Sequence, residues 1–161
     1  MSLAHRRHRT RVRTARVLAA SVALLIVSSA ASADAQDAAL QWGPAPPSLP
    51  PGARMAIVSG DPRMPGPFTI QLDLPDGFTV APHFHPTDEH QTVLQGQIGH
   101  GLGDTVNVRA IHWLHTGESG VLPANAHHYA MARGRTIVVV RSTGPFVVTY
   151  VNEKDDPRKR Q

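Results

Sequence analysis

Two histidines separated by one residue, His83 and His85, most constrain what this 161-residue chain can fold into. Successive side chains on an extended strand point to opposite faces, so both imidazoles would lie on the same face. Glu89 follows a Pro-Thr-Asp segment that can turn the chain, and Gly77 and Gly96 complete the spacing G-x5-H-x-H-x3-E-x6-G. A histidine pair alone also occurs in exposed loops. The complete spacing favours a metal site, because it brings two imidazoles and a carboxylate together.

A second stretch shows related spacing 21 residues after Gly96, where Gly117, Pro123 and His128 fit the pattern G-x5-P-x-G-x2-H-x3-N. Asn125 stands in place of the third glycine, and Ala132 in place of the final asparagine. Asparagine tolerates the left-handed backbone that such a glycine provides. Together the two stretches resemble the paired signatures of the cupin superfamily over roughly residues 65–151. The resemblance implies a small β-barrel with one metal ion, held by His83, His85, Glu89 and His128.

Three imidazoles and one carboxylate suit a divalent transition metal such as Fe, Mn, Cu, Ni or Zn, and the set does not distinguish among them. In octahedral coordination these four ligands would leave two adjacent positions open for a substrate. Glu89 could act as a ligand and, on dissociation, as a general base. Gln91 shares the strand parity of Glu89, which makes it a candidate to hydrogen-bond a ligand or a bound water.

The remaining histidines of the mature chain are expected to lie outside the ligand set. On a strand, His127 would point away from His128, although a slip of one residue in register would let it substitute. By the same alternation His90 would point away from Glu89 and lie at the surface. His100, His112 and His115 fall in a middle hairpin and are expected at the surface or the barrel rim.

Residues 1–35 are expected to be a secretory signal peptide, with six arginines, a short apolar run and an A-x-A cleavage site ending at Ala33 or Ala35. A membrane anchor is the alternative, but the apolar run falls short of the ~20 residues that span a bilayer. Six of the 16 Lys and Arg residues and one of the 12 acidic residues lie in this segment. The mature chain is therefore close to neutral, which argues against a nucleic-acid partner, and after cleavage no membrane partner is expected.

The rest of the chain predicts one all-β domain. Residues 36–54 are proline-rich and would form an arm that is either disordered or packed on a partner subunit. Short apolar or alternating runs between turns then indicate a barrel of the cupin jelly-roll type over residues 55–151, followed by a polar, frayed tail at 152–161. The expected strands are 55–58, 68–74, 78–81, 92–98, 106–114, 128–132, 136–141 and 146–151. Glycine-rich residues 99–104 would form a hairpin bend and residues 133–134 a turn.

The function expected from these features is an exported, metal-binding cupin that acts as an oxygenase or isomerase on a small chelating substrate. The alternatives are a non-catalytic, metal-dependent small-molecule binding or sensor module and a protein with a vestigial site. Residues 85–89 and 143–158 resemble a group of exported bacterial single-domain cupins, which implies a periplasmic or secreted protein. A homodimer is a further expectation from the resemblance. The cavity walls are expected to include Val80, Val93, Val121 and Phe146. The chain has no cysteine, so neither disulfides nor thiolate ligands contribute.

Overall fold

A computed structural model describes residues 40–159, and almost all of its regular structure is β-strand. The predicted signal peptide and the first residues of the proline-rich arm lie outside the described residues. The strands are β1 (Gly43–Pro44), β2 (Arg54–Ser59), β3 (Gly66–Leu74), β4 (Thr79–Phe84), β5 (Glu89–Leu102), β6 (His112–His115), β7 (Ser119–Leu122), β8 (His128–Gly144) and β9 (Thr149–Tyr150). Three short 3-10 turns complete the structure: η1 (Val108–Ala110), η2 (Glu153–Asp155) and η3 (Pro157–Lys159).

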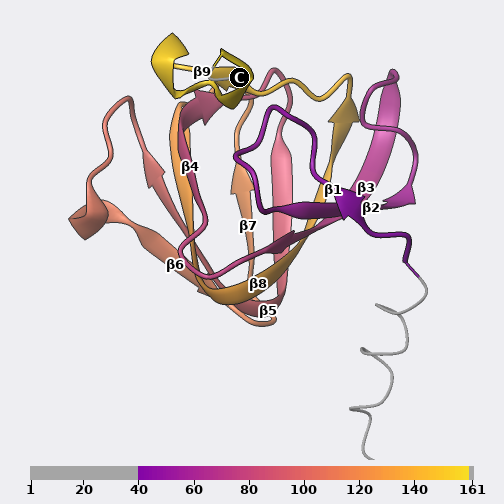
Figure 1. Cartoon of the computed structure of the whole chain (residues 1–161), viewed down its shortest axis with the longest axis horizontal. Helices are drawn as coiled ribbons and strands as arrows, with labels where there is room; N and C mark the ends of the chain where they lie inside the picture. Colours follow the sequence, from indigo (N-terminus) through magenta and orange to yellow (C-terminus); the bar gives the residue numbers. More distant parts are fainter. Residues whose placement is uncertain (1–39, 160–161) are drawn as a thin grey trace, which may run out of the picture.

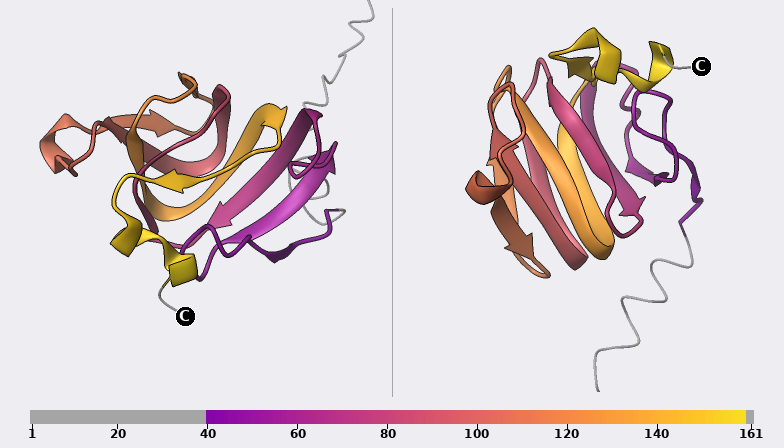
Figure 2. Two further views of the ribbon diagram at one scale, coloured as in Figure 1. Left: turned by 90° about the horizontal axis from the view of Figure 1, so that it is seen from above. Right: turned by 60° about the vertical axis from the view of Figure 1, so that its left-hand side comes forward.

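The strands form one antiparallel sheet that curls around a hydrophobic core (Figures 1 and 2). The main path of the sheet is β1-β2-β3-β8-β4-β9, and β5 pairs with β6, β7 and β8. Long β8 therefore touches β3, β4 and β5 and connects the two sides of the curl. This arrangement confirms the predicted all-β fold. Within residues 40–159 no helix is long and apolar enough to cross a membrane.

The two longest strands bend instead of ending at the turns that the sequence suggests. Gly96 in β5 and Gly134 in β8 have positive φ angles of 76° and 68°. The register between these strands shifts near Gly96, where a Cβ atom would lie 2.5 Å from the carbonyl oxygen of Arg135. The expected turn at 133–134 is thus a bend within β8. The expected hairpin bend at 99–104 is wrong as well, because β5 continues to Leu102.

The core lies inside the curl and follows the alternation of the strands. Val138 and Val140 of β8 are fully buried, and Phe68 and Ile70 of β3 pack in the same cluster. Burying an aliphatic or aromatic side chain of this size contributes roughly 1.5–3 kcal/mol relative to exposure. Since Val138 and Val140 lie beside the ligand-bearing part of the sheet, core packing fixes the backbone on which the site is built.

The described part of the proline-rich arm folds back onto its own barrel, which neither sequence-based alternative predicts. β1 pairs with β2, and Ala53 is buried in the core. The hydroxyl of Tyr150 donates a hydrogen bond of 2.8 Å to the carbonyl oxygen of Ser48, which joins the arm to β9. This contact connects residues 102 positions apart in the chain.

The C-terminal tail is also attached to the barrel up to the last described residues, so the expectation of fraying is wrong there. Arg158 pairs with the largely buried carboxylate of Asp156 and donates a 3.1 Å hydrogen bond to the carbonyl oxygen of Val148. The Asp156 pKa is lowered by its hydrogen bonds with this guanidinium. Although polar in sequence, the tail is held by hydrogen bonds within itself and to the residue that precedes β9.

Candidate metal centre

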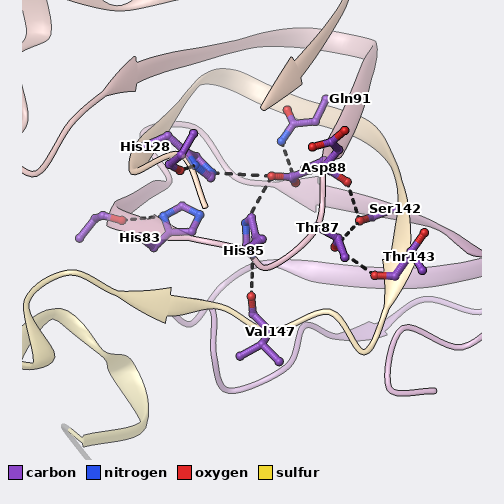
Figure 3. A network of polar contacts seen from close by, with 12 residues as sticks. His83, His85, Thr87, Asp88, Gln91, His128, Ser142, Thr143 and Val147 are labelled. Atoms are coloured by element: carbon purple, nitrogen blue, oxygen red, sulfur yellow. Dashed lines mark hydrogen bonds and ion pairs between the residues drawn. The ribbon is translucent and has the colours of Figure 1, made fainter. Parts of the chain in front are cut away.

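Three histidines meet at one end of the barrel interior, and each ring is fixed by a backbone carbonyl (Figure 3). His83 lies on β4, His85 one residue beyond its end, and His128 at the start of β8. Their Nδ1 atoms lie 2.7, 2.8 and 2.9 Å from the carbonyl oxygens of Ala81, Val147 and Ala126, respectively. A carbonyl only accepts, so each Nδ1 carries the proton. Each Nε2 lone pair is therefore available to bind a metal.

The free ring nitrogens converge with the carboxylate of Glu89. The ligand atoms of the three histidines lie within 4.8 Å of one another. Glu89 Oε2 is 3.3 Å from His85 Nε2 and 3.7 Å from His128 Nε2. A carboxylate oxygen facing imidazole lone pairs is unfavourable unless a proton or a cation lies between them. The donor set thus fits a divalent metal ion, and this histidine group could hold one.

Glu89 is kept ionised and oriented by Gln91. Burial alone would raise the pKa of Glu89, but attraction to His85 and His128 in their protonated forms and the hydrogen bond from Gln91 lower it to about 2. Gln91 Nε2 donates a 2.9 Å hydrogen bond to Glu89 Oε1, which leaves Oε2 directed at the histidines. The amide cannot turn over, because its own oxygen would then face the carboxylate. Gln91 Oε1 is consequently buried without a hydrogen-bond partner.

Burial keeps His83 and His128 in the neutral form that coordinates metals. Burial, with help from the neighbouring histidines, lowers the pKa of His83 to about 3. The pKa of His128 is also lowered, mainly by burial. Both side chains are therefore neutral at neutral pH without a metal, so metal binding does not first require removing a proton from either ring.

The end of β8 and the loop that precedes β8 fix the segment between His85 and Glu89. The hydroxyl of Ser142 donates a 2.6 Å hydrogen bond to the carbonyl oxygen of Asp88, whose carboxylate accepts a 2.7 Å bond from the backbone N–H of Ala124. The N–H of Asn125 donates to the carbonyl oxygen of His85 at 2.7 Å. Asn125 has φ of 60°, the left-handed conformation for which the sequence expected it to replace glycine.

The site opens into a cavity of about 450 Å³ in the barrel interior. Its walls include Val80 and Phe146, as expected. Val121, by contrast, is 52% exposed on β7 and does not contribute, because it faces the outside of the sheet. Val93 is fully buried in the core but is not among the residues that line the cavity. Arm and loop residues that the sequence did not indicate also line it, among them Leu49.

Most of the other histidines lie where strand alternation places them. His90, His112 and His115 are exposed. His127 is turned away from the histidine group: its Nδ1 contacts the carboxylate of Asp104, and its ring stacks on Phe84 with centroids 4.9 Å apart.

His100 is the exception, because it is partly buried and its ring lies on the inner side of the sheet. Because β5 continues past Gly99, His100 shares the inward parity of buried Ile98. Its ring centroid lies 6.5 Å from that of His128, and its Nε2 is buried without a hydrogen-bond partner. Burial lowers the pKa of His100 to about 4. Reading 99–102 as strand would have revealed this position from the sequence.

Comparison with solved structures places this fold among the cupins. A protein from Methylibium petroleiphilum assigned provisionally as an acetylacetone dioxygenase superposes with a TM-score of 0.58 at 20% identity, over 88% of this chain and 90% of that one. The polyketide cyclase RemF from Streptomyces resistomycificus gives 0.57 at 16% identity, over 76% and 87%. An RmlC-like cupin from Shewanella frigidimarina gives 0.52 at 12% identity, over 66% and 85%. No protein-family model and no curated protein sequence matches the chain.

The chain therefore has the cupin fold, as the paired sequence signatures indicate. Its structural neighbours include enzymes of different reaction classes, among them a dioxygenase and a cyclase by their descriptions. At these identities the likeness concerns the fold alone, and function has to be argued from the site itself.

Proposed function

We propose that the protein binds one divalent transition metal through His83, His85, Glu89 and His128, and uses it as an oxygenase or isomerase on a small chelating substrate. The observation that carries the proposal is that the ligand atoms of the three histidines lie within 4.8 Å of one another, with the Glu89 carboxylate 3.3 Å from His85 and 3.7 Å from His128, beside the cavity. Each Nδ1 proton is already donated to a backbone carbonyl. None of the four groups therefore has a proton left to place between the acceptor atoms that face one another.

A metal bound there would supply Lewis-acid or one-electron chemistry, depending on its identity. The protein's own groups would orient the reactants and move protons. Glu89 is ionised and can accept a proton from a substrate carbon or hydroxyl group, while Gln91 holds its other oxygen in place. The apolar walls exclude water, which strengthens the electrostatic interactions within the site.

The first test is elemental analysis of the mature protein purified from its own compartment without chelators or nickel resin. About one equivalent of iron, manganese or copper would support oxygen-dependent chemistry, measured next as oxygen consumption with candidate substrates. Zinc or nickel with substrate conversion but no oxygen uptake would support an isomerase. A metal-loaded protein that binds ligands without turnover would instead be the binding or sensor module. A folded protein that takes up no divalent transition metal would refute the proposal.

Export and dimer formation belong to the same proposal but rest on other features. The composition of residues 1–35 supports export to the periplasm or the medium. The resemblance to exported single-domain cupins supports a homodimer. N-terminal sequencing of the mature protein and its sedimentation behaviour test these two points independently of the metal.

A further inference from the structure

The cavity beside the candidate ligands is large and almost entirely apolar. Ile70, Leu74, Val80, Ile98 and Val140 line it from four different strands, and each is at most 7% exposed. Apart from the four candidate ligands, only Gln91, Ser48 and Arg63 contribute polar side chains among the described lining residues. Its volume of about 450 Å³ is about three times that of an engineered apolar cavity that admits benzene. It therefore has room for a small ligand with an apolar body.

The cavity offers no free permanent cation among its described lining residues. Arg63 is the one arginine there, and no lysine lines the cavity. The guanidinium of Arg63 is bound at both ends by the carboxylate of Asp61, with Nε 3.0 Å from Oδ1 and Nη2 2.8 Å from Oδ2. This pairing also lowers the pKa of Asp61 to about 2. The charge of Arg63 is thus balanced by Asp61, and because its side chain is 82% exposed, it gives the cavity no desolvated cation for a second carboxylate.

Charge balance at the metal centre also favours a ligand with a single negative charge. The three imidazoles are neutral ligands when Nδ1 keeps its proton, and a coordinated Glu89 carboxylate contributes one negative charge. With a divalent ion the centre carries a single net positive charge. A chelator with one negative charge makes the buried site neutral. A dianion leaves one uncompensated charge in an apolar cavity, which is costly.

We infer that the site selects chelating ligands with one negative charge and an apolar body, such as the enolate of a β-diketone, and disfavours dicarboxylates. The inference rests on the proposed metal site, since the metal provides the positive charge. Ligands rich in hydroxyl groups are disfavoured for the related reason that most of their hydroxyls would be buried unpaired.

Acetylacetone and malonate provide a matched test, because both form a six-membered chelate and differ in carrying two methyl groups or two carboxylate oxygens. We would load the full mature protein with Co²⁺, verify the metal content, and titrate each ligand by calorimetry and by the visible absorption of cobalt. Each affinity is divided by that of the same ligand for free Co²⁺ in the same buffer. The expected result is a corrected preference for acetylacetone of at least about tenfold.

A second measurement uses the apolar walls directly. Lengthening acetylacetone to 2,4-hexanedione and 3,5-heptanedione adds one buried methylene at a time, and each should tighten the corrected affinity by about fourfold. An equal or higher corrected affinity for malonate, or no gain along the diketone series, would overturn the selection while leaving the metal site intact. Failure of the protein to take up Co²⁺ would overturn both the selection and the proposed function.

Two matched lysine variants test whether the lack of a free cation in the cavity is the reason that dianions bind weakly. Ile57 lines the cavity and is 46% exposed, whereas Val121 is 52% exposed and lies outside it. Ile57→Lys should reduce the corrected acetylacetone-to-malonate preference by about tenfold, and Val121→Lys should leave it unchanged. Equal preferences in Ile57→Lys and the wild type would contradict the charge argument. If Ile57→Lys does not fold, as judged by thermal unfolding, the selection is still tested by the malonate comparison and the diketone series with the wild-type protein.

Discussion

Replacing Gln91 by methionine should weaken metal binding while hardly changing the stability of the protein. Methionine has a similar shape but cannot donate a hydrogen bond, so the 2.9 Å contact with Glu89 Oε1 is lost. The same change removes Gln91 Oε1, a buried oxygen without a hydrogen-bond partner. The two effects act in opposite directions on stability, but only the first concerns a candidate metal ligand.

The expected magnitudes follow from these two contacts. A hydrogen bond to a charged group contributes roughly 1.5–3 kcal/mol, and an unsatisfied buried oxygen costs about 1–3 kcal/mol. Losing both should therefore change the free energy of unfolding of the metal-free protein by no more than about 2 kcal/mol in either direction. Metal affinity should fall by about 10–100-fold, the usual effect of removing a group that orients a ligand.

The assay combines urea unfolding of the metal-free protein with competition between the protein and a chelator for Co²⁺. Gln97→Met is the matched control, because Gln97 also has a buried, unpartnered Oε1 but no hydrogen bond to Glu89. Gln97→Met should bind Co²⁺ like the wild type. Wild-type affinity for Co²⁺ in Gln91→Met would refute the idea that Gln91 positions Glu89. A loss of several kcal/mol in the free energy of unfolding would show that removing the unpartnered oxygen does not offset the lost hydrogen bond.

Three further predictions address the ligands, pH and packing. His128→Ala should remove most of the bound metal and His127→Ala should not, as measured by elemental analysis; equal losses would contradict the assignment of His128. Burial lowers the pKa of His83 from 6.5 in the unfolded chain to about 3. The unfolded chain therefore binds more protons between these two pH values. The free energy of unfolding of the metal-free protein, measured with urea, should be constant above pH ~6.5 and should fall below it by up to about 1.4 kcal/mol per pH unit for each such histidine. A flat profile down to pH 5 would contradict the burial. Gly101→Ala places a Cβ against the buried ring of Tyr129 and should cost about 1–3 kcal/mol in thermal unfolding, and an unchanged midpoint would show that the ring moves freely.

Sequence reasoning succeeded where a short pattern fixes local geometry. Strand alternation brought His83 and His85 to one face, although His85 lies just beyond the end of β4. Parity also identified Gln91 as a partner of the site, and the hydrogen bond to Glu89 fits that role. The left-handed conformation at Asn125 follows from the same kind of local rule.

The errors arose where glycine was taken to end a strand. Gly99, Gly101 and Gly134 lie within β5 or β8, because in a strongly curled sheet glycine permits bends and close backbone approach. The same error concealed that His100 shares the inward parity of Ile98. Contacts between distant segments, such as Tyr150 with Ser48, have no local signal, so the attachment of the arm could not be foreseen.

The ligands and the cavity walls are distributed differently over the strands and the connecting segments, and this determines how the protein can be redesigned. Strands β4, β5 and β8 carry both candidate ligands and wall residues, so their register fixes coordination and cavity shape together. The arm near Leu49 and the loop near Pro62 also line the cavity but carry no ligand. Exchanging these two short segments is therefore the route by which the range of accepted ligands can be redesigned while the metal chemistry is left unchanged.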